Sequence, residues 1–162
     1  MHTLKTTFLS VLDYGDIIYK IAAPSALKPL DAVYHSALRW VTGDSYGTHH
    51  CTLYVNAGLP SLSERRELHW HLYIFKAITG KLPPYICNLL DHSQDPYRTR
   101  SNNVKTLKVP FARTELGKEA FSVSAPRAWN DLQKSLSITL MPSVGVFREM
   151  VSNTFNHDCN CF

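Results

Sequence analysis

Residues 61–79, SLSERRELHWHLYIFKAIT, contain the clearest helix signal in this 162-residue chain. Ser61 and Glu64 have the spacing of a capping box, in which each side chain satisfies an N–H group that the helix start leaves free. Apolar residues then recur every three or four positions and share one helix face, while basic residues and a histidine lie off it. The apolar residues are Leu68, Leu72, Phe75 and Ile78, and the others are Arg65, Arg66, His69 and Lys76. We expect a helix that ends at Gly80, with its arginines on a solvated face.

The sequence around this segment is also predicted to be helical. Its first stretch is so densely apolar that we expect a buried or partner-covered helix, loosened at Gly15. The following stretches have apolar residues at helical spacing and stop at Gly43 and Gly58, which favour the end of a helix. The predicted helices cover residues 3–21, 27–41, 51–57 and 85–90.

From residue 91 on, the character of the sequence changes. Residues 91–103 are polar and lack periodicity, which is typical of a loop or linker. Residues 106–109 alternate between polar and apolar, as a strand does. Gly117 lies between two further short stretches, 111–115 and 119–123, and this arrangement predicts a β-hairpin with the glycine at its turn.

Two helices are expected after the hairpin, one opened by Ser124 and one by Ser143, with a frayed tail from Asn156. The predicted fold is therefore mainly α with a small antiparallel β-hairpin. We expect a helical, thumb-like module over residues 1–90 and a basic hairpin with helices over residues 91–162.

Composition and charge exclude several classes of protein. Charged residues make up 19% of the chain, below the usual quarter, which suggests a surface that is covered by something else. No apolar run is long enough to span a bilayer, and the N-terminus is a poor signal peptide. The four cysteines are scattered apart from Cys159 and Cys161, so we expect a reduced, intracellular protein in the cytoplasm, the nucleus or both.

Metal-ligating side chains are present, but their spacing does not predict a site. His49, His50 and Cys51 are adjacent, and residues 157–161 crowd donors at the C-terminus. Structural zinc usually needs four ligands, with cysteine pairs two to four residues apart. Cys159 and Cys161 are too close together and no second pair exists, so we predict no metal and no cofactor.

Catalytic constellations are also missing from the sequence. It has no Gly-x-Ser-x-Gly elbow and no glycine-rich phosphate loop. Asp13 and Asp16 lack a third acidic partner, so we interpret them as caps or solvent-facing charges rather than ligands for paired magnesium ions. We therefore expect no catalytic residue, and an autonomous hydrolase is disfavoured.

Positive charge gathers in one segment. Seven basic and two acidic residues lie between Tyr97 and Arg127, a balance of +5 in a chain whose formal net charge is +4. Such a segment can bind a polyanion through its phosphates, or it can be an ordinary solvated hairpin. Phe111 can stack on bases or pack inside the protein, whereas Phe121 and Trp129 are assigned to the core. The predicted nucleic-acid contacts are Arg98, Arg100, Lys105, Lys108, Arg113 and Lys118, with Arg65 and Arg66 as weaker candidates.

The order and spacing of several short motifs point to one family. They are LDYGDIIY at 12–19, ALRxVTG at 37–43, GLPSLxxRR at 58–66, FKAIxGxxPxY at 75–85, RTRS at 98–101, AFSVxAPxxWN at 120–130 and the terminal CNCF. Together they resemble the segment that follows the polymerase palm in LINE-type, non-LTR retrotransposon reverse transcriptases. The resemblance covers essentially the whole chain.

The resemblance implies a part of an RNA-directed DNA polymerase rather than an enzyme. In that family the endonuclease and the palm with its paired aspartates lie upstream, and no residue here matches the polymerase motif. The implied role is that of the thumb and C-terminal region, which grip the RNA template and primer duplex during target-primed reverse transcription. Because Met1 falls in the middle of the family pattern, we expect a decayed copy, a truncated gene model or a stand-alone remnant.

Two sets of partners follow from this interpretation. The first is RNA or an RNA–DNA duplex, together with the upstream palm in a full-length parent, and no membrane. The alternative is a repurposed protein-interaction module, which docks through the apolar helix at residues 3–21 and has no nucleic-acid role.

Overall fold

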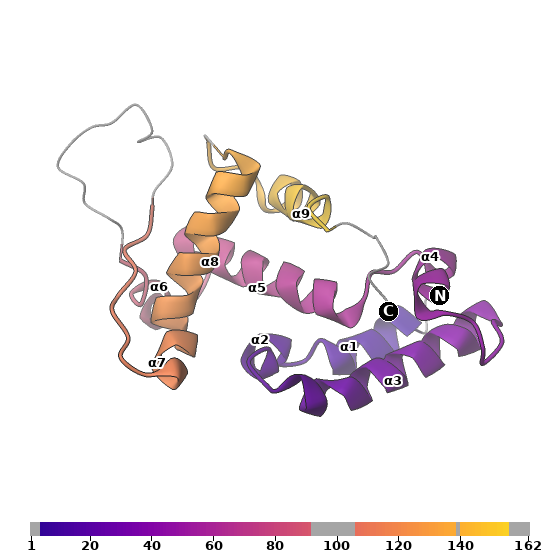
Figure 1. Cartoon of the computed structure of the whole chain (residues 1–162). Helices are drawn as coiled ribbons and strands as arrows, with labels where there is room; N and C mark the ends of the chain where they lie inside the picture. The colour runs from indigo at the N-terminus through magenta and orange to yellow at the C-terminus, as the bar shows by residue number, and fades with distance from the viewer. Residues whose placement is uncertain (1–3, 92–105, 139, 156–162) are drawn as a thin grey trace. The chain divides into compact units, whose positions relative to one another are not determined.

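The computed structural model describes residues 4–91, 106–138 and 140–155 and is mainly helical (Figure 1). These residues fall into two compact units, the first from residue 4 to His69 with Phe155, and the second from Trp70 to Thr154. None of the helices in these ranges combines the length and hydrophobicity needed to cross a membrane. The elements are the π-helix η1 (Leu4–Phe8) and the α-helices α1 (Leu9–Leu12), α2 (Asp16–Tyr19), α3 (Pro24–Thr42), α4 (His50–Ala57), α5 (Leu62–Ile78), α6 (Pro84–Cys87), α7 (Glu115–Glu119), α8 (Phe121–Leu136) and α9 (Val144–Ser152).

The first unit is built around α3 and α4, with η1 packed against α3. Tyr34 is fully buried at its centre, and its hydroxyl donates a hydrogen bond of 2.8 Å to the carbonyl of Pro60. Removal from water raises the pKa of Tyr34 to about 12. The side chains of this core are Leu9, Leu12, Tyr34, Ala37, Leu38, Leu53, Ala57, Leu59 and Leu62.

Several local signals in the sequence are confirmed. The amide of Glu64 donates to Ser61 Oγ at 3.2 Å and the amide of Ser61 donates to Glu64 Oε2 at 2.7 Å, which completes the capping box. The helices α3 and α4 end at Gly43 and Gly58, as predicted. Gly15 has a φ of +72°, a conformation that a residue with a Cβ adopts only with strain, and it separates α1 from α2.

An aromatic cluster forms the core of the second unit. The rings of Phe75 and Phe147 are stacked with their centroids 4.3 Å apart, and Trp129 lies tilted against both of them. All three side chains are almost completely buried. The prediction that Trp129 belongs to the core is therefore confirmed. Phe121 is partly buried, and the centroid of its ring lies 5.7 Å from that of Trp70 in an edge-on arrangement.

The predicted β-hairpin is wrong. The glycine at its supposed turn, Gly117, lies inside α7, and its amide donates to the side chain of Thr114 at 3.0 Å, which caps that helix. The supposed second arm is the first turn of α8, which begins at Phe121 rather than at Ser124 and contains Pro126 in its interior. Ala125, Trp129 and Leu132 of α8 are buried at helical spacing.

The predicted strand over residues 106–109 is also absent, and the described part of the chain holds no strand. Leu107 forms an isolated β-bridge rather than part of a strand, and its amide and carbonyl groups bond to the side chain of Asn130. The predictions of a polar loop over residues 92–103 and of a frayed tail from Asn156 lie outside the described residues.

The capping box gives a test of the local folding signal. The Ser61→Ala variant loses the acceptor for the amide of Glu64, so its free energy of unfolding should fall by about 1 kcal/mol. Urea unfolding followed by circular dichroism measures this change. Ser63→Ala is the matched control, because Ser63 is exposed in the same turn and should change stability by much less. Equal losses in the two variants would contradict a capping role.

Candidate functional site

Formal charge is distributed unequally between the two compact units. Residues 70–154 carry eleven Lys and Arg against six Asp and Glu, a balance of +5. Residues 1–69 and 155–162 carry six against seven, a balance of −1. The excess of positive over negative charge therefore lies in the second unit, which makes that unit the candidate for binding an anionic polymer.

An extended segment of the second unit, residues 106–114, is fastened to α8 through one side chain. The amide of Leu107 donates to Asn130 Oδ1 at 3.0 Å, and Asn130 Nδ2 donates to the carbonyl of Leu107 at 2.9 Å. The amide of Lys108 donates to the carbonyl of Asp91 at 2.9 Å. Leu107 is only 2% exposed, so it anchors the segment while its neighbours reach solvent.

The anchored segment presents two cations and an aromatic ring to solvent. Lys108 and Arg113 are exposed, and neither has an ion-pair partner among the residues the structure describes. Phe111 lies between them in sequence and is 93% exposed. Proteins bind single-stranded nucleic acid with cations that contact phosphates and with aromatic rings that stack on bases. We define these three residues as the 108–113 surface.

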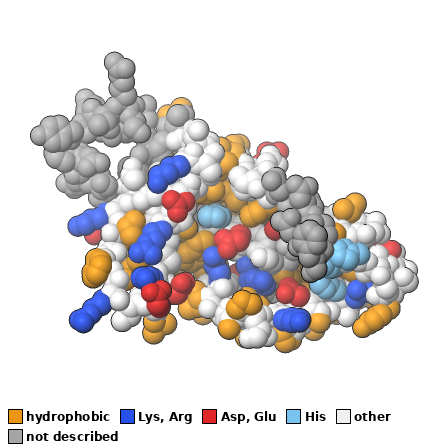
Figure 2. All heavy atoms as spheres, in the orientation of Figure 1, with side chains coloured by type: hydrophobic (Ala, Val, Ile, Leu, Met, Phe, Trp, Pro, Cys, Tyr) orange, Lys and Arg blue, Asp and Glu red, His pale blue; other side chains and the backbone are white. Residues whose placement is uncertain are grey.

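Two further cations of the second unit are paired with acidic side chains, whereas Lys81, Arg127 and Arg148 are exposed. On α7, Lys118 pairs with Glu115. On α8, Lys134 lies 3.7 Å from Asp131. Figure 2 shows Lys and Arg side chains standing among acidic and apolar ones on the visible face, so the described residues form no continuous basic field there. The candidate interface is therefore local. Arg98, Arg100 and Lys105 lie outside the described residues.

The two arginines of α5 do not lie on a solvated face, and that expectation is wrong. Arg65 forms an ion pair with Asp13, with 3.2 Å between Nε and Oδ1. Arg66 is only 9% exposed. Little of either guanidinium group is therefore accessible to a phosphate. Contact of these two residues with nucleic acid stays a prediction.

Asp13 and Asp16 were expected to be caps or solvent-facing charges. Asp13 is the C-cap residue of α1, and both carboxylates contact side chains of α5 in a charged network. Asp16 is 3% exposed, and its carboxylate contacts Nδ1 of His69 on α5. Just beyond α2, Lys20 pairs with Glu67 at 2.8 Å. A buried carboxylate needs such a partner, because its desolvation is otherwise costly. These pairs could not be predicted from local sequence patterns, since the partners are about fifty positions apart.

This network has donors for a metal ion but not the right charge. Ligand atoms of Asp13, Asp16 and His69 all lie within 4.8 Å of one another. The guanidinium of Arg65 already neutralises Asp13 and would repel a cation placed beside it. We interpret the network as a structural connection between the N-terminal helices and α5.

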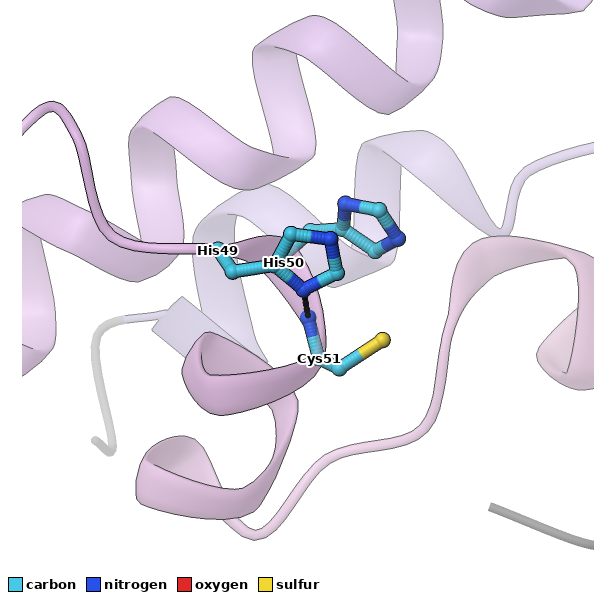
Figure 3. Close-up of side chains that lie close together, drawn as sticks. All are labelled: His49, His50 and Cys51. Atoms are coloured by element: carbon cyan, nitrogen blue, oxygen red, sulfur yellow. Dashed lines mark hydrogen bonds between the residues drawn. The ribbon is translucent and has the colours of Figure 1, made fainter. Parts of the chain in front are cut away.

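A second group of metal-ligating side chains lies where α4 begins. His49 is the N-cap, and its Nδ1 accepts a hydrogen bond of 3.4 Å from the amide of Cys51 (Figure 3). A ring nitrogen of His49, one of His50 and the sulfur of Cys51 all lie within 4.8 Å of one another. Figure 2 shows histidine side chains gathered over this part of the first unit.

The histidines near α4 are held by ring contacts. The ring of His35, from α3, stacks on that of His50 with centroids 5.4 Å apart, and His35 Nε2 lies 2.6 Å from the hydroxyl of Tyr54. Burial lowers the pKa of His50, and the neighbouring His49 and Arg39 lower it further. Burial likewise lowers the pKa of His35. Both imidazoles are therefore biased toward their neutral forms.

Comparison with models of known protein families, with curated proteins and with solved structures finds no match for this chain.

The anchor of the 108–113 surface can be tested directly. Asn130→Ala removes the partners of both backbone groups of Leu107, and leaving them unpaired costs about 1–3 kcal/mol. We expect a lower free energy of unfolding and faster hydrogen exchange at the amide of Leu107. Asn153→Ala, at an exposed site at the end of α9, is the control and should change neither quantity. Unchanged exchange at Leu107 in Asn130→Ala would show that the segment is held by something else.

Proposed function

We propose that this chain is a nucleic-acid-binding module that binds RNA or an RNA–DNA duplex through its second unit and has no active site of its own. The observation that carries the proposal is the 108–113 surface, where Lys108, Phe111 and Arg113 project from a segment that Asn130 anchors. The +5 balance of the second unit adds a long-range attraction for a polyanion.

The physical basis of binding is neutralisation of phosphate charge. Cations without a nearby acidic partner release counterions when they contact phosphates, so affinity falls as salt rises. Cations already paired with carboxylates gain less, which is why Lys118 is a weaker contact than Lys108 or Arg113. Phe111 adds stacking on an unpaired base, a contribution of about 1–3 kcal/mol per base.

The family resemblance supports the same assignment. The AFSVxAPxxWN motif at residues 120–130 begins one residue before α8 and ends at Asn130, the residue that anchors the 108–113 surface. By analogy with LINE-type reverse transcriptases, the module contributes to holding the RNA template and primer duplex, while catalysis belongs to a palm in a full-length parent. On this proposal the chain acts in the cytoplasm, the nucleus or both.

Fluorescence anisotropy with labelled single-stranded RNA tests the proposal. Lys108→Gln and Arg113→Gln should each weaken binding and reduce the log–log salt slope by roughly 0.7, the value for one phosphate contact on a single strand. Lys28→Gln removes the same charge from an exposed site in the first unit and is the matched control. Binding that does not depend on salt, or equal losses in all three variants, would contradict the proposal.

The aromatic contact has its own signature. Phe111→Ala should weaken binding of single-stranded RNA by about 5-fold or more, because one stacked base contributes about 1–3 kcal/mol. It should weaken binding of an RNA–DNA duplex much less, since paired bases are not available to the ring. Tyr46→Ala, an equally exposed aromatic site in the first unit, serves as the control. Equal effects of Phe111→Ala on the two nucleic acids would argue against stacking.

A protein-interaction module is the second candidate function, and one observation favours it. Val11, Tyr14, Ile18 and Ile21 are all more than half exposed, although they belong to the apolar segment that the sequence predicts to be covered. In a full-length parent, these side chains are candidates for contact with the palm. Two other apolar residues of this segment, Leu9 and Leu12, are in the core of the first unit.

Salt separates the two candidates. Association with a palm-containing fragment of a LINE-type reverse transcriptase should persist at high salt if apolar contact drives it, and Ile18→Asp should abolish it. Because Ile18 is 80% exposed, this substitution leaves the core of the first unit intact. Association that disappears at high salt, or that Ile18→Asp leaves unchanged, would count against this candidate.

A further inference from the structure

We propose that His49, His50 and Cys51 form a binding site for a transition-metal ion that prefers nitrogen and sulfur ligands, of which Zn²⁺ is the type. The site lies in the first unit, and it is independent of the 108–113 surface and of nucleic-acid binding.

The backbone conformation at the start of α4 brings the three donors together. Successive side chains on a helix point about 100° apart, so three consecutive residues do not normally bind one metal ion together. His49 is in an extended conformation, with a ψ of 141°, and therefore lies outside the helix while His50 and Cys51 are inside it. The result is that all three donor atoms lie within 4.8 Å of one another (Figure 3).

The donor atoms need to move only a short distance toward one another to bind one ion. Zinc binds imidazole nitrogen at about 2.0–2.1 Å and thiolate sulfur at about 2.3 Å, so ligands of one tetrahedral ion lie roughly 3.5 Å apart. Rotations of the His49 and Cys51 side chains toward His50 can supply the difference without moving the helix. Binding by His49 would displace the hydrogen bond from the amide of Cys51, which at 3.4 Å is already long and weak.

The chemistry of the donors fits the proposed ion. Thiolate and imidazole together select zinc and related metals over magnesium or calcium, which prefer oxygen. Cys51 is a thiol and not half of a disulfide. A cysteine binds a metal ion as its thiolate, so metal binding at this site releases the thiol proton.

The environment of His50 also favours metal binding. The ring of His50 contacts the rings of both His35 and His49. The stacked ring of His35 limits the rotation of His50, and His35 is itself positioned by the hydroxyl of Tyr54. Three protein ligands leave one position of a tetrahedral ion for water.

Cobalt is the probe for this site, because a thiolate bound to Co²⁺ gives a charge-transfer band in the near ultraviolet. The full-length, metal-free protein is titrated with Co²⁺, and we expect one equivalent to produce this band and Zn²⁺ to remove it. Cys51→Ser should abolish the band, and His50→Ala should weaken Co²⁺ binding by at least about tenfold. Circular dichroism of each variant confirms that it is folded.

Two matched variants exclude other thiols as the source of the signal. In Cys159→Ser/Cys161→Ser the C-terminal thiols are removed, and in Cys87→Ser the thiol of the second unit is removed. Both should bind Co²⁺ as the parent protein does. Absence of the band in the parent protein, its persistence in Cys51→Ser, or its loss in the C-terminal variant would each overturn the proposal.

A thermal measurement provides an independent readout. A metal that binds only the folded protein raises its melting temperature, and the rise depends on metal concentration. Zn²⁺ should therefore stabilise the parent protein and not Cys51→Ser, whatever happens to RNA binding. Equal stabilisation of both proteins would place the metal elsewhere.

Discussion

Pairing of charges between the N-terminal segment and α5 is the constraint on which the first unit depends. Helices of four residues, such as α1 and α2, are not stable alone and must be held by contacts from elsewhere in the fold. Leu9 and Leu12 provide apolar burial, but burial alone does not fix how the segment lies. The ion pair of Asp13 with Arg65 and the contact of Asp16 with His69 do so, because an unpaired carboxylate at the position of Asp16 would be costly.

The same pairing makes the first unit a weaker candidate than the second for binding a polyanion. In the first unit, basic side chains such as Arg65 and Lys20 are matched by carboxylates, so little positive charge is left to attract a polyanion. In the second unit, Lys108 and Arg113 have no such match among the described residues. The units therefore differ both in how many cations they contain and in what those cations contact.

Sequence patterns predicted the elements whose causes are local. The capping box at Ser61 and Glu64 and the helix ends at Gly43 and Gly58 depend on neighbouring residues, and all were found as expected. The hairpin was wrong because Gly117 is compatible both with a tight turn and with the first turn of a helix, and the cap from Thr114 selects the helix.

The candidate sites depended more on contacts that sequence does not reveal. Lys108 and Arg113 are exposed, and their contact with nucleic acid stays a prediction. The anchor at Asn130 is 23 positions from Leu107 and was not anticipated. The carboxylate partner of Arg65 is 52 positions away. At His49, His50 and Cys51 the residues were evident, whereas their convergence depends on the backbone angles of a helix cap.

The separation of the charged partners also bears on the order of events during synthesis. When residues 13–20 leave the ribosome, Arg65, Glu67 and His69 have not been made, so the first acidic residues stay hydrated until α5 follows. Each contact then closes a loop of about fifty residues, and this entropic cost precedes any gain from the contact. The second half of α5 belongs to the other unit. Translation of this helix therefore supplies the charged partners of the first unit, whereas the core of the second unit still awaits Trp129 and Phe147.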